Sequence, residues 1–140
     1  MEPVSAESYQ SIEEYRRNFE ARLKRQLDER ERARRQALQA ISEKAPSIMS
    51  SWQSVRRAYL FGSITRPGAF HEASDVDIAV EGMTAQEYFA LWRALERALP
   101  DWAIDVRDIT PISPFTNLIR KTGMLIYERA SSSATSRDSG

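Results

Sequence analysis

Residues 60–80 read LFGSITRPGAFHEASDVDIAV, and this stretch decides the fold. It starts at the end of a short strand pattern, Arg57–Phe61, and finishes in the alternating run Asp75–Val80. Between them, Gly62-Ser63 lies where the first strand is expected to pass into a short helical turn. Because glycine permits a tight turn, backbone N–H groups and the Ser63 hydroxyl can face a phosphate there. A Gly-Ser dipeptide taken alone is more often an ordinary turn.

Two aspartates are expected on one face of the Asp75–Val80 strand. Residues two apart on a strand project to the same side, so Asp75 and Asp77 point together, away from the apolar Val76 and Ile78. Each carboxylate raises the pKa of the other, and a divalent cation such as Mg²⁺ offsets that repulsion. The alternative is a solvated edge strand, although aspartate is disfavoured in strands.

A third strand pattern, Trp102–Ile109, places Asp105 and Arg107 on one face. If this strand lies beside the one that carries Asp75 and Asp77, Asp105 completes a cluster of three carboxylates. Three carboxylates are the smallest set expected to hold two metal ions and activate a hydroxyl. Asp108 projects from the opposite face, and we expect it to be solvated or to accept a hydrogen bond in a turn.

The N-terminal part of the sequence predicts one long helix. Residues 7–44 contain neither Gly nor Pro, and Ala45-Pro46 is expected to end the helix. At 1.5 Å per residue it would be roughly 55 Å long, more than the small domain behind it can cover. Its first half carries an apolar stripe that is expected to be an interface with another chain. The stripe consists of Ile12, Tyr15, Phe19, Leu23 and Leu27. The charged stretch 28–35 is expected to lie in solvent.

Further signals predict two more helices and a last strand. A capping box, Thr84–Glu87, opens a helix that Pro100 closes, Ser113-Pro114 starts a short helix, and 124–127 is a strand. Strands and helices therefore alternate behind the long N-terminal helix, and the resemblance described below implies an α+β fold, a small mixed sheet with helices packed on it. We divide the chain into that helix (1–46), a compact domain (47–129) and a disordered tail (130–140).

Composition excludes several classes of function. The 140 residues include 20 basic and 20 acidic side chains, so the net charge is zero. A protein that binds nucleic acid mainly through counterion release usually has an excess of basic residues, which this chain lacks. Cysteine is absent, which removes disulfides and thiol catalysis and suits the cytoplasm. The single histidine, His71, is expected in an exposed loop and argues against a Ser-His-Asp triad. No apolar run approaches the roughly 20 residues of a membrane helix, and no signal-peptide core is seen. An enzyme of this composition would have to use carboxylates, hydroxyls and backbone amides.

The order Gly62-Ser63, Asp75-x-Asp77 and Asp105, with its strand context, resembles the nucleotidyltransferase superfamily typified by DNA polymerase beta. It is most similar to the minimal, MNT-type nucleotidyltransferases that act as antitoxins beside HEPN-domain toxins. The resemblance covers about residues 55–128, including the closing LIRKTGMLIY at 118–127. The family often has an arginine directly after the Gly-Ser, where this chain has Ile64, and Arg66 is the nearest candidate.

This resemblance implies an enzyme similar to protein adenylyltransferases, which moves a nucleoside monophosphate, most simply AMP from ATP, onto a hydroxyl acceptor. The acceptor it implies is a tyrosine of a HEPN-type toxin. It implies that Asp75, Asp77 and Asp105 are catalytic and hold Mg²⁺ in a two-metal site. The same resemblance assigns nucleotide binding to Gly62, Ser63 and Arg66. Residues 47–129 would then form the nucleotidyltransferase domain, and the helix 7–44 would bind the toxin or a second copy.

Two other functions stay open. One is nucleotidyl transfer to an RNA 3′ end, with the basic first helix as the docking surface. The charges of that helix are largely paired in sequence, which argues against it. The other is a non-catalytic module that neutralises a partner by contact through the long helix. The intact carboxylate set argues against this second reading.

Overall fold

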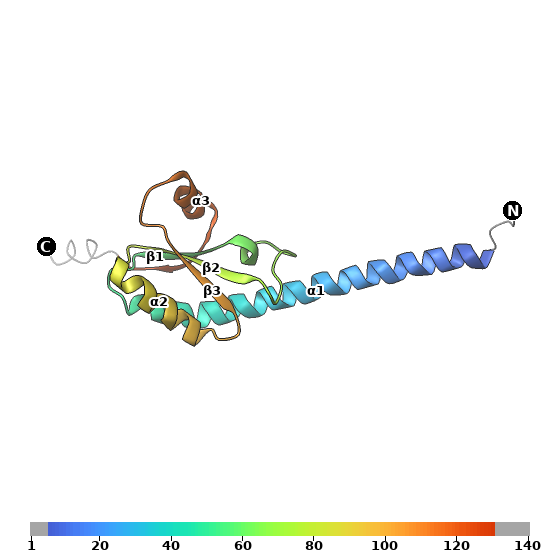
Figure 1. Cartoon of the computed structure of the whole chain (residues 1–140), viewed down its shortest axis with the longest axis horizontal. Helices are drawn as coiled ribbons and strands as arrows, with labels where there is room; N and C mark the ends of the chain where they lie inside the picture. The colour runs from blue at the N-terminus through green and yellow to red at the C-terminus, as the bar shows by residue number, and fades with distance from the viewer. Residues whose placement is uncertain (1–5, 131–140) are drawn as a thin grey trace.

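The computed structural model describes residues 6–130, which form one four-stranded sheet with helices on both faces (Figure 1). In chain order the elements are α1 (Ala6–Ser50), β1 (Arg57–Phe61), η1 (Gly62–Thr65), β2 (Asp75–Glu81), α2 (Ala85–Ala98), β3 (Ala103–Asp108), α3 (Pro114–Thr122) and β4 (Met124–Glu128). This order confirms the predicted α+β class. The predicted disorder of 130–140 falls, apart from Ala130, outside the described residues.

The sheet is mixed, with strand order β3-β2-β1-β4. β1 pairs antiparallel with both β2 and β4, whereas β2 and β3 run parallel. A parallel pair needs a crossover connection, and α2 supplies it. The predicted strands are confirmed, with ends that shift by one residue at most. The parallel pairing matters most for function, because it sets the carboxylates of β2 beside that of β3.

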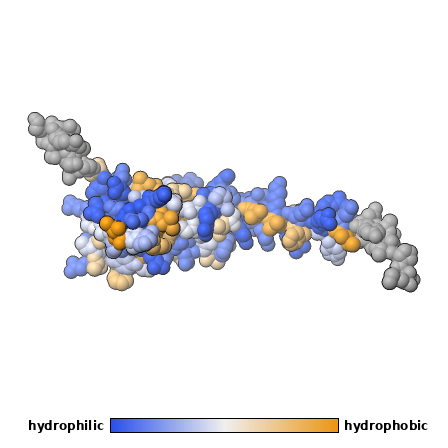
Figure 2. All heavy atoms as spheres, turned by 90° about the horizontal axis from the view of Figure 1, so that it is seen from above, coloured by the Kyte–Doolittle hydropathy of each residue, from blue (hydrophilic) through white to orange (hydrophobic). Residues whose placement is uncertain are grey.

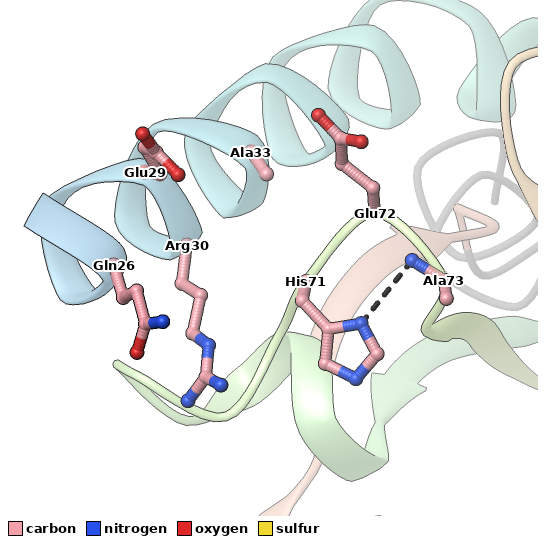
Figure 3. Close-up of a pocket in the computed structure, with 7 residues that line it drawn as sticks. All are labelled: Gln26, Glu29, Arg30, Ala33, His71, Glu72 and Ala73. Atoms are coloured by element: carbon pink, nitrogen blue, oxygen red, sulfur yellow. Dashed lines mark hydrogen bonds between the residues drawn. The ribbon is translucent and has the colours of Figure 1, made fainter. Parts of the chain in front are cut away.

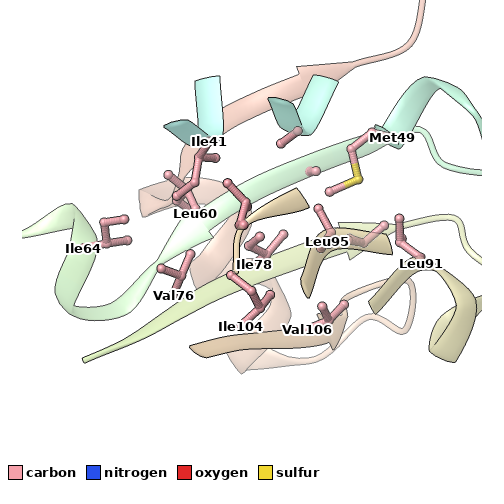
Figure 4. Packing of buried hydrophobic residues seen from close by; sticks show 14 of the residues in the cluster. Ile41, Met49, Leu60, Ile64, Val76, Ile78, Leu91, Leu95, Ile104 and Val106 are labelled. Atoms are coloured by element: carbon pink, nitrogen blue, oxygen red, sulfur yellow. The ribbon is translucent and has the colours of Figure 1, made fainter. Parts of the chain in front are cut away.

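Most of the core lies between the sheet and the helices α1 and α2. Alternate residues of the strands, including Leu60, Val76, Ile78 and Val106, turn toward these helices and are buried (Figure 4). From the helices, the core receives Ala37, Ile41, Ala45 and Met49 of α1 and Leu91 and Leu95 of α2. A smaller apolar cluster beneath α3 covers part of the other face. The remaining part of that face is open, and the aspartates lie there.

The predicted end of the first helix at Ala45-Pro46 is wrong, because α1 continues through Pro46 to Ser50. Proline removes one N–H from the helical ladder and usually breaks a helix interior. Here the turns on either side of Pro46 are anchored, since Ala45 and Met49 are completely buried in the core. Burial of these two side chains therefore overrides the local preference. The domain boundary at residue 46 stays a prediction. The inner half of α1, which contains Ala37, Ile41, Ala45 and Met49, contributes to the core.

The expectation that residues 28–35 lie in solvent is also wrong for part of that stretch. Arg34 donates from Nε to the carbonyl of Ile64 at 2.8 Å, and Arg30 donates to the carbonyl of Gly68 at 3.3 Å. Both carbonyls belong to the connection between β1 and β2. The charged side chains thus provide donors for loop carbonyls, a use that hydrophobic periodicity cannot reveal.

The predicted start of α2 is confirmed. The side chain of Glu87 bonds to two hydroxyl groups, whereas in a capping box it would bond to the backbone N–H of Thr84. Thr84 accepts from the backbone N–H of Glu87, as an N-cap should. The Glu87 carboxylate accepts from the hydroxyls of Ser54, at 2.6 Å, and Thr84, at 2.7 Å. These two hydrogen bonds, Ser54 first, lower the pKa of Glu87. α3 carries the complete capping box, between Ser113 and Thr116.

The three tryptophans, Trp52, Trp92 and Trp102, are half-buried and pack against the core. Trp92 also donates from its indole N–H to the carbonyl of Ile104 at 2.8 Å, which ties α2 to β3. No helix within residues 6–130 is long and apolar enough to cross a membrane.

Candidate active site

Three aspartates lie on the open face of the sheet, on adjacent parallel strands. Asp77 of β2 is the direct neighbour of Asp105 of β3, and Asp75 is two residues before Asp77 on the same face. The residues between them, Val76 and its neighbour Ile104, are buried on the opposite face. The strand pairing on which the predicted carboxylate cluster depended is therefore present.

Asp77 is affected by the charges of the two aspartates beside it. The pKa of Asp77 is raised, first by its partial burial and then by the negative charges of Asp105 and Asp75. Arg107 opposes this effect and lowers the pKa of Asp77. A cation that approaches the open face would stabilise the ionised form of Asp77 and lower its pKa.

Arg107 is the cation that the structure places in this cluster. Its Nε donates to Oδ2 of Asp105 at 3.2 Å. The sequence pattern put Arg107 on the face of Asp105 but assigned it no role. A basic residue two positions after a candidate aspartate on a strand is the signal that could have found it. The contact orients the Asp105 carboxylate.

Gly62 brings the β1–η1 turn into contact with Asp77. Its φ of +76° is in the left-handed region, which glycine adopts without strain. A Cβ at this position would lie 2.3 Å from Oδ2 of Asp77, so only glycine lets the carboxylate approach the backbone here. Glycine is therefore required at position 62 by the turn and also by the position of the Asp77 carboxylate. Ser63 follows in the same turn and is half-exposed.

Arg66 is exposed and follows η1 directly, and its backbone N–H donates a hydrogen bond to the carbonyl of Ser63 at 3.0 Å. Its role in nucleotide binding stays a prediction.

His71 is exposed in the same connection, as expected, and its Nδ1 accepts from the N–H of Ala73 at 3.2 Å. Asp108 is exposed and accepts from the N–H and hydroxyl of Thr110, at 2.9 and 2.6 Å, as a turn acceptor should.

An apolar ledge borders the aspartates on the α3 side. Phe61, the cross-strand neighbour of Asp77, meets the ring of Phe115 edge-on at 6.2 Å. Phe115 is 54% exposed, Leu118 on the same helix 56%, and Ile112 just before it 83%. We define the apolar ledge as Ile112, Phe115 and Leu118. Its exposure suits contact with another apolar surface.

The donors present fit magnesium bound together with a substrate. Among the described residues, no group of three or more His, Cys, Asp or Glu side chains is arranged to hold a metal ion. Mg²⁺ is commonly bound by one or two carboxylates, with waters and substrate phosphates as its remaining ligands. Asp75, Asp77 and Asp105 provide carboxylate oxygens, and the pKa of Asp77, raised first by burial and then by its two neighbours, would be lowered by a cation. The site therefore fits a metal–nucleotide complex better than a metal ion alone.

Residues 43–132 match the family model described as polymerase beta nucleotidyltransferase. A solved structure described as a toxin–antitoxin with AMP-PNP is 25% identical, with a TM-score of 0.53, and the match covers 63% of this chain and 73% of that chain. A mutant of the toxin–antitoxin MntA–HpeT is 22% identical with the same TM-score of 0.53 and the same coverage, 63% and 73%, and supports the fold alone. Comparison with curated proteins gives no match.

Proposed function

Because the chain belongs to the polymerase beta nucleotidyltransferase family, we propose that it transfers AMP from ATP to a hydroxyl group. The observation that carries this proposal is the set of three aspartates on neighbouring parallel strands beside the Gly62 turn. Asp75 and Asp77 would hold Mg²⁺, with Asp105 completing a second metal site. When bound, the metal supplies charge neutralisation on the triphosphate.

The residues of the chain then have distinct roles. Ser63 and the amides of its turn bind the terminal phosphates, and Arg66 lies close enough in sequence to assist. Asp105, oriented by Arg107, accepts the proton of the acceptor hydroxyl. The hydroxyl oxygen bonds to the α-phosphorus, the bond from that phosphorus to the bridging oxygen breaks, and pyrophosphate leaves.

For the acceptor we propose a tyrosine hydroxyl of a HEPN-type toxin, which would make this chain an antitoxin. Two observations support a polypeptide acceptor. The similar structure at 25% identity is a toxin–antitoxin with AMP-PNP, an analogue of ATP. The apolar ledge is exposed, is linked to the aspartates through the contact of Phe115 with Phe61, and is suited to a protein surface.

The alternative acceptor, an RNA 3′ end docked on the basic first helix, fits the geometry less well. The inner half of α1 packs on the face of the sheet opposite the aspartates, and two of its arginines already bind loop carbonyls. Neutralisation by contact alone would leave the carboxylate cluster without a role.

The test uses a purified HEPN-type toxin as acceptor, with α-labelled ATP, Mg²⁺ and the purified chain. We expect label on that protein, and on a tyrosine after peptide mapping. A 3′-hydroxyl RNA oligonucleotide serves as the competing acceptor, and label on the RNA alone would contradict the protein acceptor. No label on either would contradict the transfer of AMP.

Two isosteric variants provide the matched comparison in this assay. Asp105→Asn should reduce labelling at least 100-fold, about 2.7 kcal/mol on the barrier, because it removes the proton acceptor and a metal ligand. Asp108→Asn should leave labelling within about twofold, since Asp108 is a turn acceptor and an amide oxygen can still accept from Thr110. Equal losses in both variants would contradict the assignment of Asp105.

A further inference from the structure

The outer half of α1, residues 6–27, projects beyond the sheet (Figure 1), and apolar patches lie along its surface (Figure 2). Exposure ranges from 44% to 75% along the apolar stripe, which consists of Ile12, Tyr15, Phe19, Leu23 and Leu27. Single exposed apolar residues are common on proteins, but a contiguous row of five on one helix marks an interaction surface.

The apolar stripe lies on the same face of α1 as the residues that bury into the core. Eighteen residues make about five complete helical turns, so Phe19 lies directly in line with Ala37, and Leu23 with Ile41. Ala37 and Ile41 are completely buried by the sheet. α1 therefore has one continuous apolar face, of which the domain covers only the inner half.

We propose that the outer half of α1 pairs antiparallel with the same segment of a second copy of this chain. The geometry excludes a parallel pair, because both domains sit on the apolar face and would occupy the same space between the helices. In an antiparallel pair each domain lies beyond the outer end of the other helix. Both exposed rows are then covered in one two-fold interface, with Phe19 near its centre.

Charges along the outer half suit this direction. Its outer end carries Glu13 and Glu14, and its inner end carries Arg22, Lys24 and Arg25, with Arg16 and Arg17 between the two ends. With Ile12 opposite Leu27, Glu14 lies opposite Arg25 of the second copy, and this attraction opposes the repulsion between Arg17 and Arg22. Antiparallel pairing brings the acidic end of each helix to the basic end of the other. The arginines further along α1 are partly engaged already, because Arg30 and Arg34 donate to loop carbonyls of their own domain.

An open pocket lies at the inner end of the apolar stripe. This pocket, of about 370 Å³, separates α1 from the loop that leads to β2 (Figure 3). Its walls include Gln26, Arg30 and Ala33 from α1 and His71 and Glu72 from the loop. The start of the second copy's α1 would lie at the mouth of this pocket. The pairing would thus also brace the connection that ends at Asp75.

Light scattering on the purified chain tests the pairing. The wild type should have twice the chain mass of 16.0 kDa, and Phe19→Asp with Leu23→Asp should halve the measured mass. The matched control is Asn18→Asp with Ala21→Asp, which adds the same charge about 100° and 200° around the helix from Phe19 and should remain dimeric. A monomeric wild type, a dimeric stripe variant or a monomeric control would each overturn the proposal. A cooperative thermal melt in each variant confirms that the domain is folded.

Cysteine cross-linking tests the direction, since the chain has no cysteine of its own. Ile12→Cys alone should not form a disulfide-linked dimer, whereas a mixture of Ile12→Cys and Leu27→Cys chains should form a mixed one. A disulfide between two Ile12→Cys chains would show parallel helices and overturn the proposal.

Discussion

Asp77→Asn is expected to abolish nucleotidyl transfer, with a loss of at least 100-fold, or about 2.7 kcal/mol on the barrier. Asp77 is central to the cluster, with Asp105 directly beside it on β3, Asp75 on its own strand and the Gly62 backbone against its carboxylate. The amide has the same shape but one oxygen and no charge, so it is a poor magnesium ligand. Labelling of the acceptor with α-labelled ATP measures the effect. Activity within about tenfold of the wild type would show that Asp77 does not hold the metal.

The same variant should keep or raise the stability of the metal-free protein. Because the folded-state pKa of Asp77 is raised, the stability it contributes is fully present below its ordinary pKa and is lost as pH rises through the raised value. At neutral pH the ionised carboxylate therefore destabilises the fold, and asparagine removes that charge. Thermal melting with a chelator should show an unchanged or higher Tm. A clearly lower Tm would mean that the lost activity reflects unfolding.

Gly62→Ala should have the second largest effect, a loss of at least tenfold in nucleotidyl transfer. The new Cβ would lie 2.3 Å from Oδ2 of Asp77, so the carboxylate must leave its position. The backbone at φ +76° also disfavours alanine, by about 1–2 kcal/mol of folding stability. Transfer assays and chemical denaturation on the same preparation separate the two effects.

Gly68→Ala is the matched control for that change. Gly68 has φ +80°, and the nearest atom to a Cβ there is Leu27 Cδ2 at 3.6 Å, an ordinary contact. This variant should lose similar stability and retain activity within about twofold. If both variants lost activity equally, backbone strain in the loop would explain the effect, and contact with Asp77 would not.

Local patterns predicted much of the fold and the placement of the aspartates. The strand carrying Asp75 and Asp77 shows clear period-two alternation, and the capping residues mark the starts of α2 and α3. The family resemblance is confirmed by the match over residues 43–132. These features depend on residues close together in sequence, which is why one sequence suffices to recognise them.

The features that the sequence did not predict depend on contacts between distant segments. Helix α1 passes Pro46 because the sheet buries Ala45 and Met49. Arg34 binds a carbonyl thirty residues away, and Gly62 is required partly by the carboxylate of Asp77. The contact of Arg107 with Asp105 spans only two residues, yet its role depends on the neighbouring strand.

Calorimetric titration of the purified chain with ATP, in the presence and absence of Mg²⁺, tests the central claim most directly. The claim is that Asp75, Asp77 and Asp105 form a metal-dependent nucleotide site with the Gly62–Ser63 turn. It predicts saturable binding with Mg²⁺ at submillimolar ATP, and loss of this binding with a chelator or in Asp77→Asn. Absence of binding at millimolar Mg–ATP would contradict the claim and favour neutralisation of a partner by contact alone.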